Sequence, residues 1–290
     1  ELKIIATDSA VNAFKNKEVD VTAVTFEQAN EFAGKPELVK ANDGGIYYLL
    51  FNTKENVFKN AKVRRAITMA INKEELVNKV LEGSEKLTKT FTPSGIGLNG
   101  VSKDFPAEVA TDQPKFNVAE AKKLLAEGLK EEGLSELPRF EILFNDTGSR
   151  KAIAEYIQES LRINLGVNIN IEGMTFQSRL DKMQHRDYEI ALAGYNGDYN
   201  DAITYLDRFL TKDGNNYSDY SNPRYDELVK KVKSSGNQQE RVKDMIEMEK
   251  IIAEDMPVGL LYYRENTKLL NPRVHNIVFS QIGKDFVLDN

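Results

Sequence analysis

Residues 194–201, with the sequence Gly-Tyr-Asn-Gly-Asp-Tyr-Asn-Asp, concentrate side chains that can bind a ligand or catalyse a reaction. Two carboxylates, Asp198 and Asp201, lie three residues apart in this segment. A pair of carboxylates can hydrolyse glycosidic bonds, and a single carboxylate can accept hydrogen bonds from an ammonium group. A solvated turn, in which Asn and Asp bond to their own backbone, uses the same residue types. The segment alone leaves these three interpretations open.

The rest of the chain carries few residues suited to catalysis. His185 and His275 are far apart in sequence, and the polar neighbours of His185 predict a surface position. Cysteine is absent, which excludes disulfides, thiol nucleophiles and thiolate metal sites. The chain contains no P-loop or HExxH motif. The sequence therefore indicates a protein that is not an enzyme and that binds no metal or cofactor.

The length and the net charge of the chain further restrict the class of protein and its possible partners. The 290 residues suffice for one large domain or two lobes. A net charge of -6 argues against a nucleic-acid partner, because phosphate binding requires a basic face. No apolar run approaches the roughly 18 residues of a membrane-spanning helix. The chain begins Glu-Leu-Lys without a signal peptide, so we expect a mature form or a fragment.

Apolar patterns position the segment within an α/β protein. Residues 188–193 predict a strand that leads into it, and residues 46–51 (IYYLLF) predict a strand buried on both faces. Further strands are predicted for residues 2–7, 19–24, 140–144, 167–171 and 258–263. Helix starts and ends are predicted at Asn72, Asn117, Gly166, Asn222 and Asn237.

Several segments together resemble the peptide-binding receptors of ABC importers, the family 5 solute-binding proteins. The segments that carry the resemblance are Ile46–Asn52, Phe58–Ile67, Ala70–Glu74, Asn117–Leu125, Asn164–Ile169 and Tyr188–Asp201. They keep the order of the family over essentially the whole chain. The resemblance implies that this chain is the C-terminal part of a longer protein.

The same resemblance implies a type II periplasmic-binding-protein-like fold with two lobes that close over a ligand by hinge motion. The N-terminal part of lobe I would be missing. On this basis residues 1–52 belong to lobe I, residues 53–265 form lobe II, and residues 266–290 return to lobe I. The hinge is then expected at Asn52–Thr53 and Glu265–Asn266.

In the family, an aspartate at the position of Asp198 binds the α-ammonium group of the peptide. Charge-assisted hydrogen bonds of this kind contribute about 1.5–3 kcal/mol each. Tyr195, Asn196 and Gly197 are expected to line the ligand beside it, with Tyr195 as an apolar wall with a polar tip. Asp201 is expected on the solvent side of the loop.

The chain departs from the family pattern at two positions. Leu192 stands where some relatives carry an arginine that pairs with a peptide carboxylate. Arg150 stands near the start of a predicted helix where relatives place a histidine, and it is a candidate anchor for the C-terminus of the peptide. A surface position in the first turn of the helix is the alternative for Arg150.

The predicted function is that of an extracytoplasmic receptor, periplasmic or lipid-anchored at a bacterial cell surface, which delivers peptides to a membrane-embedded ABC permease. It would act as a monomer, without nucleic acid, metal or cofactor. The alternatives are a receptor of the same fold for a nickel complex, an oligosaccharide or haem, and a carboxylate-based hydrolase.

Overall fold

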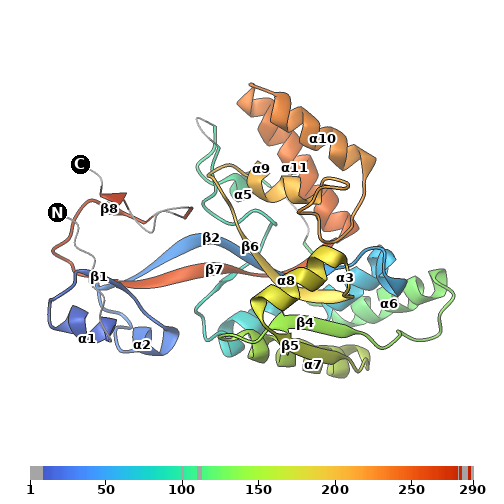
Figure 1. Cartoon of the computed structure of the whole chain (residues 1–290), viewed down its shortest axis with the longest axis horizontal. Coiled ribbons are helices and arrows are strands. Elements are labelled where there is room, and N and C mark those ends of the chain that lie inside the picture. Colours follow the sequence, from blue (N-terminus) through green and yellow to red (C-terminus); the bar gives the residue numbers. More distant parts are fainter. Residues whose placement is uncertain (1–8, 99–100, 110–112, 280, 283–286, 289–290) are drawn as a thin grey trace.

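A computed structural model of the chain describes residues 9–98, 101–109, 113–279, 281–282 and 287–288. The strand predicted for residues 2–7 lies outside the described residues. Two long strands, β2 (Leu38–Phe51) and β7 (Val258–Leu270), run side by side through most of the length of the molecule (Figure 1). They join a small body to a large one.

The small body surrounds one end of this strand pair. It contains β1 (Val21–Ala23), which pairs with β7, and helices α1 (Ala10–Lys15) and α2 (Phe26–Asn30). Its core is a cluster that includes Val11, Phe14, Phe32 and Leu269. The two-residue strands β8 (Ile277–Val278) and β9 (Val287–Leu288) pair with each other.

The large body extends the same sheet beyond β2. The strand order is β1-β7-β2-β6-β4-β5, and the short β3 (Lys86–Leu87) also pairs with β7. β6 (Ile190–Asn196) runs antiparallel to β2 and parallel to β4 (Glu141–Asn145). β5 (Asn170–Met174) is parallel to β4 at the edge. The C-terminal ends of β4, β5 and β6 therefore face the same way.

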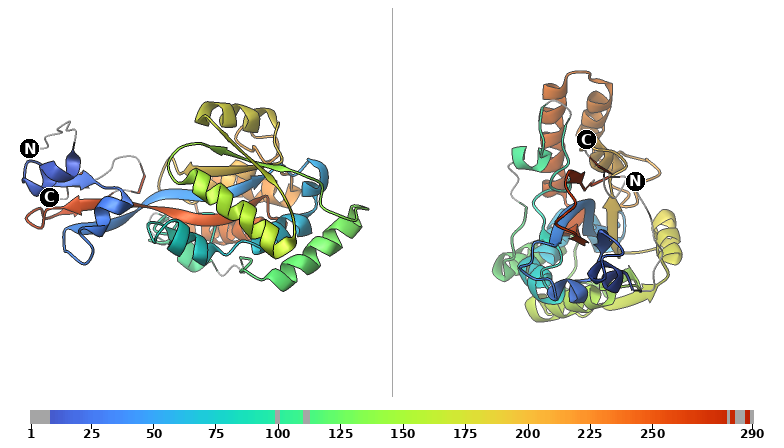
Figure 2. Two further views of the ribbon diagram at one scale, coloured as in Figure 1. Left: turned by 90° about the horizontal axis from the view of Figure 1, so that it is seen from below. Right: turned by 90° about the vertical axis from the view of Figure 1, so that its left-hand side faces the viewer.

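Helices cover both faces of this sheet (Figure 2). Their bounds are α3 Ala61–Met69, α4 Lys73–Glu75, α5 Phe105–Glu108, α6 Val118–Glu131, α7 Arg150–Leu165, α8 Phe176–His185, α9 Ile203–Leu206, α10 Pro223–Ser234 and α11 Gln238–Asp255. Short turns of other helix types span Asn56–Lys59, Leu76–Val80 and Asp207–Phe209.

The alternation of β2 divides the apolar residues into two cores. Tyr47, Leu49 and Phe51 belong to a core shared with α3, α6 and α7. Ile46, Tyr48 and Leu50 belong to a second core shared with α9, α10 and α11, to which Met183 of α8 also belongs. Residues 46–51 are thus buried on both faces, as the continuous apolar run predicts.

Short-range signals in the sequence determine several helix starts and ends. The side chains of Asn72, Asn117, Asn222 and Asn237 each accept a hydrogen bond from a backbone N–H of the first helical turn. α7 ends at Gly166, which has a left-handed conformation (φ 71°). One strand is displaced from its predicted range of residues 167–171. β5 begins at Asn170, and residues 167–169 form the connection from α7.

The pairing of β2 with β7 is interrupted by a bulge near residue 44. Asn42 lies opposite Glu265 and Ile46 lies opposite Tyr263, so two extra residues of β2 are accommodated in between. Gly44 has φ 68° there. From Gly45 to Phe51, β2 also pairs with β6 of the large body. Within the described residues, no helix has the length and apolarity needed to cross a membrane.

Candidate functional site

The candidate residues gather where parallel strands end. Tyr195, Asn196, Gly197 and Asp198 form the end of β6 and the loop after it, and Arg150 begins α7 just after β4. Ligands of open α/β sheets bind outside the carboxyl ends of the strands. The fold therefore brings Arg150 and the Asp198 loop to the same end of the sheet, although 48 residues separate Arg150 from Asp198 in the sequence.

Asp198 is exposed, and its loop holds it in place from two directions. The Tyr195 hydroxyl donates to Asp198 Oδ2 at 2.8 Å, and the Asp198 N–H donates to Thr204 Oγ1 at 3.1 Å. The Tyr195 ring is packed edge-on against Tyr205, and the Arg208 guanidinium lies 3.9 Å from its centroid. Asp198 thus presents a carboxylate to solvent from a braced position.

Asn196 and Gly197 connect this loop to the irregularity in β2. Asn196 Nδ2 donates to the Asp43 carbonyl at 3.0 Å, and Arg264 donates to Asn196 Oδ1 at 3.1 Å. Arg264 also forms an ion pair with the buried Asp43 at 2.9 Å. Burial raises the pKa of Asp43, although Arg264 and the Gly45 N–H both lower it. These contacts couple the loop to the strands that join the two bodies.

Two glycines are required by close packing. A Cβ atom at Gly197 would lie 2.5 Å from the Tyr205 hydroxyl oxygen. A Cβ atom at Gly194 would lie 2.9 Å from the Tyr47 ring, which faces it from the neighbouring strand. The glycines of the 194–201 segment therefore serve the internal packing of the loop.

Arg150 is half-buried and is held by the backbone and by an aromatic ring. Its Nε donates to the Tyr47 hydroxyl at 3.1 Å, and its NH1 donates to the carbonyl and hydroxyl of Thr147, both at 3.0 Å. Within the described part of the chain it forms no ion pair with a carboxylate. Since Tyr47 also packs on Gly194, Arg150 lies beside the strand that carries the loop.

Asp201 is not on the solvent side of the loop, contrary to the sequence-based expectation. Its Oδ2 accepts from Arg241 NH2 at 2.7 Å, and its Oδ1 accepts from the Ile203 N–H at 3.0 Å. The side chain of Arg241 is only 11% exposed, and that of Asp201 is 19% exposed. Asp201 anchors the loop to α11. His185, in contrast, has a side chain that is 72% exposed, as predicted.

A family comparison identifies the class of protein. Residues 1–217 match the model of "Bacterial extracellular solute-binding proteins, family 5 Middle". The chain belongs to this family.

Curated relatives of this family 5 chain include peptide-binding proteins from several bacteria. The dipeptide-binding protein DppE of Bacillus subtilis is 28% identical over 93% of this chain and 49% of its own length. The periplasmic oligopeptide-binding protein OppA of Salmonella typhimurium is 28% identical over 100% of this chain and 52% of its own length. The chain thus spans about half the length of these relatives.

Solved structures confirm the fold of this family 5 chain. A Bacillus anthracis structure, the substrate-binding domain of an oligopeptide ABC transporter, superimposes with a TM-score of 0.82 at 27% identity, over 96% of this chain and 55% of its own length. Listeria monocytogenes OppA bound to peptide gives a TM-score of 0.79 at 29% identity, over 96% and 54%. The predicted α/β, periplasmic-binding-protein-like fold is therefore confirmed.

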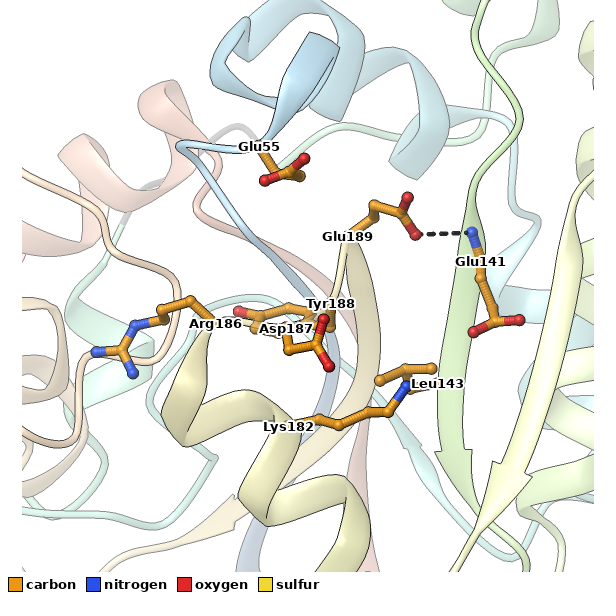
Figure 3. Close-up of a pocket in the computed structure, with 8 residues that line it drawn as sticks. All are labelled: Glu55, Glu141, Leu143, Lys182, Arg186, Asp187, Tyr188 and Glu189. Atoms are coloured by element: carbon orange, nitrogen blue, oxygen red, sulfur yellow. Dashed lines mark hydrogen bonds between the residues drawn. The ribbon is translucent and has the colours of Figure 1, made fainter.

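This chain also contains a polar cavity of about 240 Å³ at the other end of β6 (Figure 3). Its lining residues are Glu55, Glu141, Leu143, Lys182, Arg186, Asp187, Tyr188 and Glu189. The Glu141 N–H donates to Glu189 Oε2 at 3.1 Å. Burial and the neighbouring Glu172 raise the pKa of Glu141. In the described chain, no group of three or more acidic or histidine side chains is arranged to bind a metal ion.

Sequence reasoning missed the residues that brace the site. Asp43, Arg264, Tyr205 and Arg208 come from β2, β7 and the α9 region, and no motif links them to the loop. One signal was available: Asp43-Gly44-Gly45 is a turn-type sequence inside a strand, which marks a bulge.

Proposed function

We propose that this chain is the ligand-binding part of an extracytoplasmic peptide receptor that delivers peptides to an ABC permease. The supporting observation is a pair of opposite charges beyond the C-terminal ends of β4 and β6. Asp198 offers an exposed carboxylate, and Arg150 offers a guanidinium without a carboxylate partner among the described residues. A free peptide carries the complementary ammonium and carboxylate groups at its two ends.

The role of each residue follows from its chemistry. Asp198 accepts hydrogen bonds from the α-ammonium group, which has three donors. Tyr195 holds the carboxylate through its hydroxyl, and Asn196 and Gly197 set the course of the loop. Arg150 is the anchor for a carboxylate, because its planar fork matches that group. The protein binds without catalysing a reaction.

We propose a modest shift of one lobe boundary. Lobe I would comprise residues 1–44 and 266–290, and lobe II the residues between, with the first crossing at the β2 irregularity instead of Asn52–Thr53. The pairing of residues 45–51 with β6 supports this. The second crossing, at Glu265–Asn266, lies directly opposite Asn42 and Ala41. Hinge motion would then bend the two long strands where the bulge loosens their pairing.

Relatives named as periplasmic binding proteins support a location outside the cytoplasm. We propose either the periplasm or a lipid-anchored position at the cell surface. The partners would be a peptide and a permease, and the receptor would act as a monomer.

The test is mass spectrometry of small molecules released when the purified chain is unfolded, combined with calorimetric titration of free peptides. Recovered peptides, or saturable peptide binding that N-acetylation weakens, are the expected results. We expect weak affinity for this chain alone, because an open half-site cannot exclude water from Asp198. Recovery of a nickel complex, an oligosaccharide or haem, or hydrolysis of an offered glycoside, would contradict the proposal.

A further inference from the structure

Residues 88–98, which we call the strap, run from the end of β3 to the loop that carries Asp198. Apart from an isolated bridge between Leu98 and Ser102, the strap has no regular secondary structure. It is nevertheless part of the second core, where Phe91, Ile96 and Leu98 are at most 2% exposed. A buried backbone without a helix or a strand needs partners from elsewhere in the fold.

Glu249 of α11 supplies two of these partners. Its side chain is completely buried. One carboxylate oxygen accepts from the Phe91 N–H at 2.9 Å, and the other accepts from the Thr92 N–H at 2.8 Å. In the described part of the chain, Glu249 forms no ion pair. A buried carboxylate is costly unless hydrogen bonds satisfy it. Here the bonds that satisfy it are those that hold the strap.

Tyr263 of β7 holds the same backbone through its hydroxyl group. The oxygen accepts from the Thr90 N–H at 2.8 Å and from the Lys89 N–H at 3.1 Å. The hydroxyl also donates to the Thr90 carbonyl at 2.8 Å. Tyr263 is itself only 2% exposed. The first half of the strap is therefore anchored to two elements of the large body, α11 and β7.

The second half of the strap is fixed against the residues that follow it. The Leu98 N–H donates to the Ser102 carbonyl at 2.7 Å, and the Phe105 N–H donates to the Ile96 carbonyl at 2.7 Å. A Cβ atom at Gly97 would lie 2.8 Å from the Ser102 carbonyl oxygen. These close contacts set the direction in which the Gly97 N–H points.

The Gly97 N–H contacts the loop that carries Asp198. It donates to Asn200 Oδ1 at 3.0 Å. Asn200 is exposed and lies two residues after Asp198. The bonds of Asp198 itself, to Tyr195 and Thr204, stay within residues 195–204. The bond of Asn200 therefore ties this loop to a strap that is anchored in the core.

We propose that the strap positions the Asp198 loop for ligand binding, with Glu249 as the anchor of the strap and Asn200 as its contact with the loop. The inference rests on the proposed peptide-receptor function, in which Asp198 binds the α-ammonium group. Hydrogen bonds weaken steeply when their angle is distorted. Glu249 and Asn200 are thus positioning residues, which act on the ligand through the direction of the Asp198 carboxylate.

The test is calorimetric titration of the chain with tetra-alanine and with N-acetyl-tetra-alanine. The two peptides differ only at the ammonium group, so the ratio of their affinities measures the contact with Asp198. A loss of stability alone lowers both affinities and leaves the ratio unchanged. The variants are Asn200→Ala, Asn200→Asp and Glu249→Gln. Amide hydrogen exchange at residues 91, 92 and 97 reports whether the strap contacts are broken.

Two control variants make the same side-chain changes at exposed positions. Glu254→Gln lies on α11, as Glu249 does, and Asn78→Ala lies in the turn of residues 76–80. Both should keep the affinity ratio of the parent.

Asn200→Ala should lower the affinity ratio roughly three- to tenfold, because one hydrogen bond that orients the loop is lost. The Gly97 amide should then exchange faster. Asn200→Asp keeps an acceptor oxygen, so Gly97 exchange should stay slow and the ratio should not fall below that of the parent. Glu249→Gln places an amide donor opposite one of the two strap N–H groups, and the ratio should fall by about twofold or more.

An unchanged ratio in Asn200→Ala, with faster exchange at Gly97, would overturn the positioning role of the strap and leave the proposed function intact. An unchanged ratio in folded Glu249→Gln, with faster exchange at residues 91 and 92, would overturn the role of Glu249 as the anchor. If Glu249→Gln does not fold, the two Asn200 variants decide the proposal. Equal affinities of the parent for the two peptides, or no binding of either, would contradict the proposed function of Asp198 and the positioning role with it.

Discussion

The hydroxyl group of Tyr205 donates a hydrogen bond to the carbonyl of Gly44 at 2.6 Å. The same hydroxyl accepts a hydrogen bond from the Gly197 N–H at 3.1 Å. One buried oxygen therefore connects the β2 irregularity, where the two bodies meet, to the loop that presents Asp198. We therefore expect any bending of β2 at Gly44 to move this loop as well.

Replacing Tyr205 with Phe should loosen the loop. Two backbone groups would lose their partner in a place where Tyr205 itself is fully buried, so the free energy of unfolding should fall by about 1–3 kcal/mol. Amide hydrogen exchange at Gly197 should accelerate. Tyr225→Phe is the matched control, because its buried hydroxyl donates to the Leu206 carbonyl instead. Unchanged Gly197 exchange in Tyr205→Phe would refute the coupling.

Replacing Asp198 with Asn should weaken the binding of free peptides roughly tenfold or more, because a charge-assisted bond is lost. N-acetylation of the peptide removes the same contact from the other side, so the two changes should be strongly non-additive in a double-mutant cycle. Asp181→Asn is the control, since that side chain is 64% exposed on α8. Simple additivity would show that Asp198 is not the ammonium partner.

Asp201→Asn should destabilise the fold by about 2–3 kcal/mol, because the Arg241 charge would remain largely buried without its partner. Urea unfolding measures the effect. Glu159→Gln breaks an ion pair of similar length, but its side chains are 53% and 55% exposed, and it should change stability by less than about 1 kcal/mol. Equal effects of the two substitutions would contradict the structural role of Asp201.

The raised pKa of Glu85 predicts that the stability of the folded chain depends on pH. Burial raises its pKa from the ordinary value of 4.5 to about 7, although the Glu265 N–H and Arg264 lower it; Asp43 and Glu265 contribute further upward shifts. The folded state therefore binds the proton more tightly than the unfolded state. The resulting stabilisation is complete below pH 4.5 and is lost as the pH rises through about 7.

Urea titrations at pH 5 and pH 8 test this dependence. The parent should lose about 1–2 kcal/mol more than Glu85→Gln over this interval, because glutamine stays neutral and can still accept from the Glu265 N–H. Glu74→Gln, at an exposed position of α4, should behave like the parent. Parallel pH profiles for the parent and Glu85→Gln would contradict the raised pKa.

Local sequence determined the elements of this protein. Asn117 accepts from the Glu120 N–H within one helical turn, and Gly166 ends α7 because it adopts a left-handed conformation readily. The run IYYLLF is buried on both faces because its six apolar residues alternate between two cores. Such signals depend on neighbours in the chain, and they are readable without a structure. Family order added the position of Asp198, whose role as the ammonium partner stays a prediction.

Tertiary structure alone decided what surrounds that position. Asp201 resembles Asp198 in sequence, yet it pairs with Arg241 of α11, forty residues away. Arg150 has ordinary helical neighbours, but its guanidinium donates to the hydroxyl of Tyr47, more than a hundred residues earlier. Burial and charge pairing result from elements that are distant in sequence. Because these energies depend on which side chains exclude water together, only the folded chain determines them.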